Sequence, residues 1–425
     1  MTWLPEPLRI PAFRAFWLAR LASTIAQMAM VIVIGWQVYD IARQTMGVGD
    51  AAFQLGLIGL FQFVPLFVLT PVSGWAADRF DRRHIARAVL GLELVCAVIL
   101  FAATWSGQIS LPILFAVAVL LGVARAFAGA SFAALAANLV PRKLLPRAIA
   151  LSSTAWQAGA IIGPALGGIL YDVVPHLSYA VSSALFTFSA ICMFLIGPVE
   201  RPAAEPGNPL RRMAEGLAYI RRNQLVLGAI TLDLFAVLLG GVTAMLPIYA
   251  RDILEVGAQG LGPLRAAPAI GATLTAIFFS FRPIRTNVGV KMLAAVVVFG
   301  AATAIFGVSR WMPLSLLMLA LLGAADMFSV YIRQSLIQLH TPDAMRGRVG
   351  AASTLAISAS NELGEARSGF SAALVGPVTA TVAGGIAAIV ITLAWSRLFP
   401  ALREARTFDL PEPAPEKAPV TAGGV

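Results

Sequence analysis

The run Leu374–Ser396, LVGPVTATVAGGIAAIVITLAWS, contains no charged side chain. A helix needs about 20 mostly apolar residues to cross the hydrocarbon core of a bilayer, so this run predicts a transmembrane helix. Only 12% of the 425 residues are charged and 59% are hydrophobic, with a mean hydropathy of +0.82. Ordinary soluble domains carry roughly 25% charged residues. The composition therefore excludes a soluble enzyme, a disordered protein and a nucleic-acid-binding protein.

Twelve apolar runs of this kind occur along the chain. A β-barrel would show short alternating segments instead, so we expect an all-α integral membrane protein with twelve transmembrane helices. The runs lie at residues 15–39, 52–73, 88–106, 109–137, 147–170, 177–197, 224–250, 259–281, 291–309, 312–336, 348–372 and 374–396.

Basic residues are distributed unequally between the connections. Seventeen arginines and lysines lie in one alternating set of connections, against three in the other set. Because basic loops stay on the cytoplasmic side, both termini and the central connection are expected in the cytoplasm. The excess of ten positive charges thus favours a multi-pass protein of the cell inner (plasma) membrane.

The two halves of the chain resemble each other. Leu121-Gly122-Val-Ala-Arg125-Ala-Phe127 returns as Leu322-Gly323-Ala-Ala-Asp326-Met-Phe328, and the same offset relates Arg147 to Arg348. The repeat predicts two six-helix bundles, 1–197 and 224–398, with a cytoplasmic linker at 198–223. The proline-rich polar segment 399–425 is expected to be a disordered cytoplasmic tail.

The connection between the second and third runs reads Gly74-Trp-Ala-Ala-Asp78-Arg79-Phe-Asp81-Arg82-Arg83. It resembles the G-x-x-x-D-R-x-G-R-R signature of the major facilitator superfamily, although Asp81 replaces the second glycine. The resemblance implies a gate in which Gly74 permits close helix approach and Asp78 caps or pairs at a helix end. Arg79, Arg82 and Arg83 would bind acids or helix carboxyl ends in the closed gate.

Two further segments resemble motifs of this superfamily. Leu121-x-x-x-Arg125-x-x-x-Gly129 in the fourth run matches a motif whose arginine is implicated in proton or substrate coupling. The fifth run matches the glycine-rich motif of the exporters (antiporters), G-x-x-x-G-P-x-x-G-G. Its glycines also suit close helix packing. The motif residues are Gly159, Gly163, Pro164, Gly167 and Gly168.

Segments in the C-terminal half indicate which branch of the superfamily the chain resembles. Leu232-Asp233-Leu-Phe-Ala-Val-Leu-Leu-Gly240-Gly241 and Asn361-Glu362-Leu-Gly364-Glu365, with Gly35-Trp36-Gln37-Val38-Tyr39, are similar to the enterobactin-exporter-like branch of the superfamily. The resemblance implies the major facilitator fold and a catecholate siderophore as substrate. A drug-like molecule or another metabolite would fit the candidate cavity residues equally well.

Ionisable residues inside membrane spans are functional candidates, because burying a charge in lipid is costly. Glu362 and Glu365 share one helical face and could bind and release a proton. Arg125 and Asp326 are equivalent by the repeat and could meet in one central cavity. Alternatively, single acids could lock helices by pairing with arginines. The candidates for substrate and proton coupling are Arg125, Asp233, Asp326, Glu362, Glu365 and Arg367.

The sequence thus predicts a secondary active transporter, a proton-coupled exporter that works by alternating access around a central site. The partners would be a small-molecule substrate, protons and the bilayer, with no nucleic acid, and the chain would be a monomer. An importer or facilitator of the same fold is the alternative. A membrane-embedded enzyme or a sensor is disfavoured, because the three histidines lie at connections and Cys96 and Cys192 have no metal-ligand spacing. No cofactor and no metal are expected.

Overall fold

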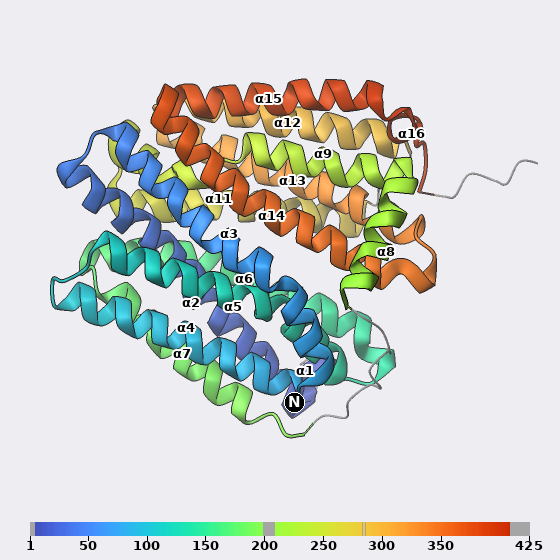
Figure 1. The fold of residues 1–425 in the computed structure, drawn as a ribbon, viewed down its shortest axis with the longest axis horizontal. Coiled ribbons are helices and arrows are strands. Elements are labelled where there is room, and N and C mark those ends of the chain that lie inside the picture. Colours follow the sequence, from blue (N-terminus) through green and yellow to red (C-terminus); the bar gives the residue numbers. More distant parts are fainter. Residues whose placement is uncertain (1–4, 199–208, 283, 285, 409–425) are drawn as a thin grey trace, which may run out of the picture.

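The computed structural model describes residues 5–198, 209–282, 284 and 286–408 (Figure 1). Over this part of the chain the structure is helical and contains no strand, as expected. The helices are α1 (Glu6–Arg9), α2 (Pro11–Thr45), α3 (Val48–Arg79), α4 (Arg82–Trp105), α5 (Leu111–Asn138), α6 (Leu145–Val173), α7 (Leu177–Phe194), α8 (Pro209–Arg222), α9 (Gln224–Gly240), α10 (Leu246–Ile248), α11 (Gly257–Phe281), α12 (Val288–Val308), α13 (Met312–Leu339), α14 (Asp343–Val375), α15 (Pro377–Leu398) and α16 (Pro400–Glu404).

Each of the twelve apolar runs corresponds to a long helix or, in one case, to a broken one. By length and composition, ten helical segments of the described chain could cross a membrane. α6 and α14 are also long, at 29 and 33 residues, but they are more polar. α14 is polar because it carries Glu362, Glu365 and Arg367 inside its length.

The run 224–250 differs from the continuous helix expected there. α9 ends at Gly240, and Gly241 takes an extended conformation (φ −62°, ψ 127°). A 3₁₀ turn at Thr243–Met245, the short α10 and a π-helical turn at Tyr249–Ile253 complete the crossing. Adjacent glycines with Pro247 shortly after them interrupt the helix, because glycine adds no side-chain restraint and proline lacks an amide donor.

The helices form two groups that lie side by side (Figure 1). In the first helix group, α2–α7, α2 packs against α6 and α7, and α4 packs against α5 and α7. In the second helix group, α9–α15, α12 packs against α13 and α15, and α11 packs against α13. α8 joins the groups at the end where α1 and α16 also lie; we call this the linker end, and the opposite end the far end.

Parts of the predicted linker and tail are helical. The linker contains α8, whose Gly216 lies against the backbone of Arg348. α16 falls within the predicted tail, and its Leu402 is buried. Residues 199–208 and 409–425 lie outside the described residues.

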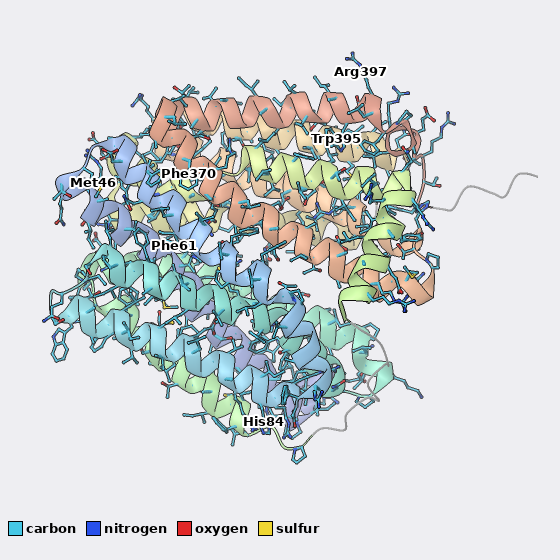
Figure 2. All side chains as sticks on the ribbon, in the orientation of Figure 1. Met46, Phe61, His84, Phe370, Trp395 and Arg397 are labelled. Atoms are coloured by element: carbon cyan, nitrogen blue, oxygen red, sulfur yellow. The ribbon has the colours of Figure 1, made fainter. Side chains whose placement is uncertain are left out.

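Close contacts between the two groups concentrate toward the far end. A Cβ at Gly369 of α14 would lie 2.4 Å from the Gly56 Cα of α3, and one at Gly168 of α6 would lie 2.7 Å from the Ala258 oxygen of α11. Nearby, the ring of Phe370, labelled in Figure 2, has its centroid 5.0 Å from that of Phe53. Small residues thus let the groups meet backbone to backbone at this end.

Toward the linker end the same helices are not in close contact. A Cβ added at Gly74 of α3, at Gly129 of α5, or at Gly347 or Gly350 of α14 would meet no heavy atom within 4 Å. The close helix approach expected at Gly74 is therefore absent from this conformation, because the groups diverge there. The structure is closed at the far end and open at the linker end.

A larger side chain at the far-end contact between α3 and α14 should destabilise this conformation. We expect Gly369→Val to lower the free energy of unfolding by about 1–3 kcal/mol, because its side chain has no room against Gly56. The check is the melting temperature in detergent. Gly350→Val on the same helix is the control and should change stability little; equal losses in both variants would refute the packing argument.

Candidate functional site

Two glycines bring three helices together at mid-length. A Cβ at Gly122 of α5 would lie 2.6 Å from the Gln62 backbone oxygen of α3. A Cβ at Gly59 of α3 would lie 2.8 Å from the Glu362 backbone oxygen of α14. α3 is therefore held tightly between α5 and α14, and the side chains one turn away on these helices can meet.

An ion pair forms at this junction between the two groups. Arg125 of α5 pairs through Nη1 with Oε1 of Glu362, and Nη1 also donates to Oε1 of Gln62 at 3.1 Å. The Arg125 side chain is 35% exposed, whereas that of Glu362 is 3% exposed. Glu362 Oε2 is buried and makes no hydrogen bond in the described part of the structure. A buried carboxylate held by one arginine is costly to leave unpaired.

Glu365 lies one turn further along α14. Its Oε1 accepts a hydrogen bond from Thr243 at 3.0 Å and lies 3.9 Å from Arg265 Nη2. Glu365, Arg265, Gln62 and Thr243 line a cavity of about 50 Å³ between the two groups. The broken segment after α9 supplies Thr243, so the break places a hydroxyl against the acid.

Asp233 lies away from this junction. It pairs with Arg333 of α13, and both side chains are almost completely buried within the second helix group. The pair joins α9 to α13, which corresponds to the helix-locking alternative considered for a single acid.

Asp326 and Arg125 do not pair. Asp326 forms no ion pair among the described residues, and Arg125 binds Glu362 instead. The repeat makes Arg125 and Asp326 equivalent in sequence, but equivalence alone does not bring their side chains together.

Arg367 is positioned at the break in α9. Its Nη2 donates to Ser368 Oγ at 3.0 Å, and Ser368 Oγ donates to the Gly241 carbonyl oxygen at 2.8 Å. A cation near the carboxyl end of a helix stabilises the exposed carbonyl groups. Arg367 therefore supports the break rather than contacting the Arg125–Glu362 pair.

Sequence reasoning missed one acid. Glu93 of α4 is buried within its helix, with an exposed fraction of 4%, and interacts electrostatically with Arg125. Its being the one charge in an otherwise apolar run was the signal that could have identified it.

The connection between α3 and α4 is stabilised within the first helix group. The Asp81 carboxylate accepts from the Arg83 amide at 2.9 Å and caps α4, and its φ of −66° requires no glycine. Hydrogen bonding to Arg83 lowers the pKa of Asp81 to about 2. Asp81, which stands in place of the second glycine of the motif, thus serves as a helix cap.

The arginines that follow hold the carboxyl end of α7. Arg83 donates to the Ile196 oxygen at 3.2 Å, and Arg87 donates to the Met193 oxygen at 3.2 Å. Arg79 is exposed and Arg82 half-buried, while the Asp78 side chain lies outside the described residues. The predicted binding of a helix carboxyl end thus involves Arg83, together with Arg87.

The glycine-rich motif of α6 has two contact faces. A Cβ at Gly159, Gly163 or Gly167 would lie within 2.8 Å of α2 atoms. On the other face, Gly168 approaches α11, and a Cβ at Gly262 of α11 would lie 2.9 Å from the Pro164 oxygen. The motif therefore packs α6 within its own group and also against the second group.

Reciprocal ion pairs close the far end. Arg43 of α2 lies 3.3 Å from Asp252, and Arg251 lies 2.7 Å from Asp40 of α2. The Tyr39 hydroxyl also donates to Asp252. Each helix group thus contributes one acid and one arginine to these contacts.

The site therefore consists of charged groups between two helix groups. No cluster of three or more His, Cys, Asp and Glu residues that could hold a metal occurs in the part of the chain that the structure describes.

Comparisons with known proteins agree with this architecture. The family model described as Major Facilitator Superfamily matches residues 15–365. The enterobactin exporter EntS of Citrobacter koseri is 27% identical over 415 residues, 96% of each chain. That of Escherichia coli O9:H4 (strain HS) is 27% identical over 386 residues, 90% of each chain.

Solved structures share the fold at low sequence identity. A bacterial homologue of the human lysosomal transporter Spinster, inward-facing and unoccupied, has a TM-score of 0.70 at 15% identity and covers 94% of this chain and 99% of its own. A D-xylose–proton symporter has a TM-score of 0.68 at 13% identity, covering 92% and 98%. A POT family transporter in complex with 5-aminolevulinic acid has a TM-score of 0.74 at 11% identity, covering 92% and 96%.

The expected resemblance to the enterobactin-exporter-like branch is confirmed by these relatives. The chain is a multi-pass membrane transporter and not an enzyme, and it belongs to the Major Facilitator Superfamily.

Proposed function

We propose that this transporter exports a small molecule, a siderophore or a drug-like compound, in exchange for protons. The observation that carries the proposal is the Arg125–Glu362 ion pair, which links the two helix groups at mid-length. The name of the relatives, enterobactin exporter, supports export and a siderophore-like substrate. An importer or facilitator of the same fold is the alternative that the direction of flux decides.

Proton coupling follows from the chemistry of this pair. Glu362 has one oxygen on Arg125 and one oxygen without a hydrogen-bond partner. A proton that binds Glu362 neutralises the carboxylate and releases Arg125, whose side chain is 35% exposed. Conversely, a hydrogen-bond donor of the substrate can bind the ionised Glu362 carboxylate, which a bound proton neutralises. Substrate and proton thereby compete for Glu362, which is what exchange requires.

Glu365 and Glu93 extend the proton path. Glu365 lies beside Arg265 and Thr243 in the small cavity, while Glu93 of α4 interacts electrostatically with Arg125. Arg125 therefore has an acid in each helix group. When Arg125 loses its contact with Glu362, Glu93 can still supply a counter-charge.

Alternating access supplies the movement in this proposal. The close contacts toward the far end, and the open space around Gly74 and Gly350, correspond to a state open at the linker end. With basic loops in the cytoplasm, that end faces the cytoplasm. The opposite state requires the pairs Arg43–Asp252 and Arg251–Asp40 to separate.

The proposed orientation is testable by labelling. Gln108→Cys, in the exposed connection after α4, should react with a membrane-impermeant maleimide in intact cells. Lys143→Cys, at the linker end, should react only in inverted vesicles. Cys96 and Cys192 are buried, so the parent chain serves as the unlabelled control. The reverse pattern would refute the orientation.

The direction and coupling are testable in inverted vesicles with enterobactin as the probe. An acid interior should drive enterobactin into the vesicles, and enterobactin addition should cause proton efflux. Glu362→Gln and Glu365→Gln should each reduce this proton movement by about tenfold or more, because the amide cannot carry a proton. Asp326 forms no ion pair among the described residues, and Asp326→Asn tests its part in proton movement in the same assay.

A matched control is Glu255→Gln, because Glu255 is exposed between the π-helical turn and α11. Its proton movement should equal that of the parent chain. Full proton movement in Glu362→Gln and Glu365→Gln would refute the coupling mechanism. If adding enterobactin caused no proton movement in vesicles with the parent chain, enterobactin would be refuted as a substrate.

A further inference from the structure

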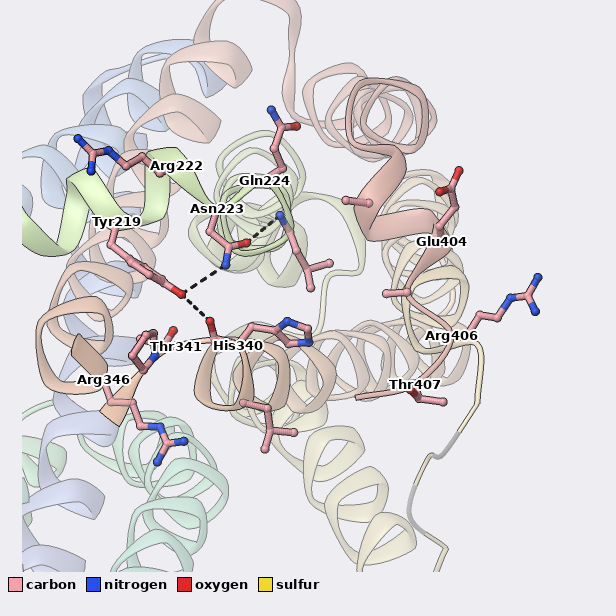
Figure 3. A pocket seen from close by; sticks show the side chains of 15 residues that line it. Tyr219, Arg222, Asn223, Gln224, His340, Thr341, Arg346, Glu404, Arg406 and Thr407 are labelled. Atoms are coloured by element: carbon pink, nitrogen blue, oxygen red, sulfur yellow. Dashed lines mark hydrogen bonds between the residues drawn. The ribbon is translucent and has the colours of Figure 1, made fainter. Parts of the chain in front are cut away.

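Two cavities of the described structure differ in what they can bind. The larger, of about 1230 Å³, lies at the linker end of the second helix group. Its arginines Arg222, Arg346 and Arg406 lie apart from one another (Figure 3), so they form no compact site. The smaller, of about 50 Å³, lies between the two helix groups and gathers several polar groups in a small space.

The side-chain amide of Gln62 has one possible orientation at this small cavity. Its Oε1 accepts from Arg125 Nη1 at 3.1 Å, and a guanidinium has donors only, so the amide nitrogen must point away from Arg125. Nε2 carries two hydrogens and makes no hydrogen bond with a described residue. Because Gln62 is only 4% exposed and lines the small cavity, the cavity is the space that these hydrogens face.

The opposite wall of the cavity offers hydrogen-bond acceptors. The Glu365 carboxylate and the Thr243 hydroxyl oxygen can accept, and Arg265 can donate. Thr243 already donates to Glu365 Oε1 at 3.0 Å, which leaves lone pairs on both groups for a further donor. Most of the other lining residues are apolar, such as Ile32 and Leu55.

A water molecule matches this cavity in size and in hydrogen bonding. Water takes about 30 Å³ in the liquid, so a volume of about 50 Å³ holds one molecule. A buried water makes about three hydrogen bonds, and one here can accept from Gln62 Nε2 and donate to the Glu365 and Thr243 oxygens. The two donors of the wall, Gln62 and Arg265, disfavour a metal cation in the same place.

We propose that the small cavity binds one water molecule and that Gln62, held by this water, is a positioning residue for Arg125. The water joins Gln62 to Glu365, so a continuous network links Glu362, Arg125, Gln62 and Glu365. Two acids of α14 are thereby connected through the first helix group. The inference rests on the proposed function, because it concerns the ion pair that takes up the proton there.

The contact with Gln62 becomes important when Glu362 takes up a proton. The neutral carboxyl no longer pairs with Arg125, but Gln62 Oε1 still accepts from the guanidinium. Arg125 therefore stays at the junction and re-forms the ion pair when the proton leaves. Without the water, the amide of Gln62 is free to turn and Arg125 loses this second acceptor.

The network is testable by a double-mutant cycle on the melting temperature of the full-length chain in detergent. Gln62→Met and Glu365→Met nearly keep the side-chain length and remove the hydrogen-bonding groups. If a water links the two side chains, the double variant should lose less than the sum of the two single losses. The control pair is Gln62→Met with Glu255→Gln, whose shifts should add, because Glu255 is exposed and outside the cavity.

Gly35→Val tests the cavity without changing a polar group. A Cβ at Gly35 would lie 3.6 Å from Pro247 Cγ, an ordinary contact, and both residues line the cavity. The valine should take the space of the water. In a Gly35→Val background the losses from Gln62→Met and Glu365→Met should therefore add.

Transport separates positioning from a purely structural role. Per folded protein, Gln62→Met and Gly35→Val should each lower the maximal rate of enterobactin-driven proton movement about tenfold. KM should be unchanged, because Gln62 positions Arg125 and does not contact the substrate.

Parent-like rates in Gln62→Met and Gly35→Val, or additive losses in the cycle of the parent chain, would overturn the inference. If the parent chain moves no protons with enterobactin, the export function fails, while the melting cycle still decides whether the water network exists. If Gln62→Met/Glu365→Met does not fold, the rates of Gln62→Met and Gly35→Val decide.

Discussion

A charged side chain at mid-membrane depth needs a counter-charge, and Arg125 finds one on the other helix group. Because Glu362 belongs to α14 and Arg125 to α5, the pair can exist only while α3 holds these two helices together. Gly59 and Gly122 permit that approach. Packing between the groups and compensation of the Arg125 charge therefore depend on each other, and in the proposed mechanism a proton on Glu362 would change both.

The internal repeat is visible in ion pairs as well as in helices. Arg147 and Arg348, equivalent by the sequence offset, each pair with a glutamate of the short helix that precedes their half. Arg147 lies 2.5 Å from Glu6 of α1, and Arg348 lies 2.6 Å from Glu215 of α8. These equivalent contacts fasten the linker-end helices to their own halves while the space between the halves stays open.

Most of the fold was predictable from apolar runs such as Leu374–Ser396, because crossing lipid demands both length and hydrophobicity. The break at Gly240–Gly241 was not, since adjacent glycines and Pro247 permit a break without fixing its place, and hydrogen bonds of Thr243, Ser368 and Arg367 stabilise it in the folded chain. The site charges could be identified one by one. Their pairing could not, because the repeat relates Arg125 to Asp326 whereas contact between helices brings it to Glu362.

The central claim is that protonation of Glu362 controls whether the two helix groups stay closed at the far end. The direct measurement is the distance between spin labels at Gln108→Cys and Arg310→Cys, which lie on connections of different helix groups, as a function of pH. We expect the distances to lengthen on acidification in the parent chain and to be independent of pH in Glu362→Gln. The same pH response in both proteins would contradict it.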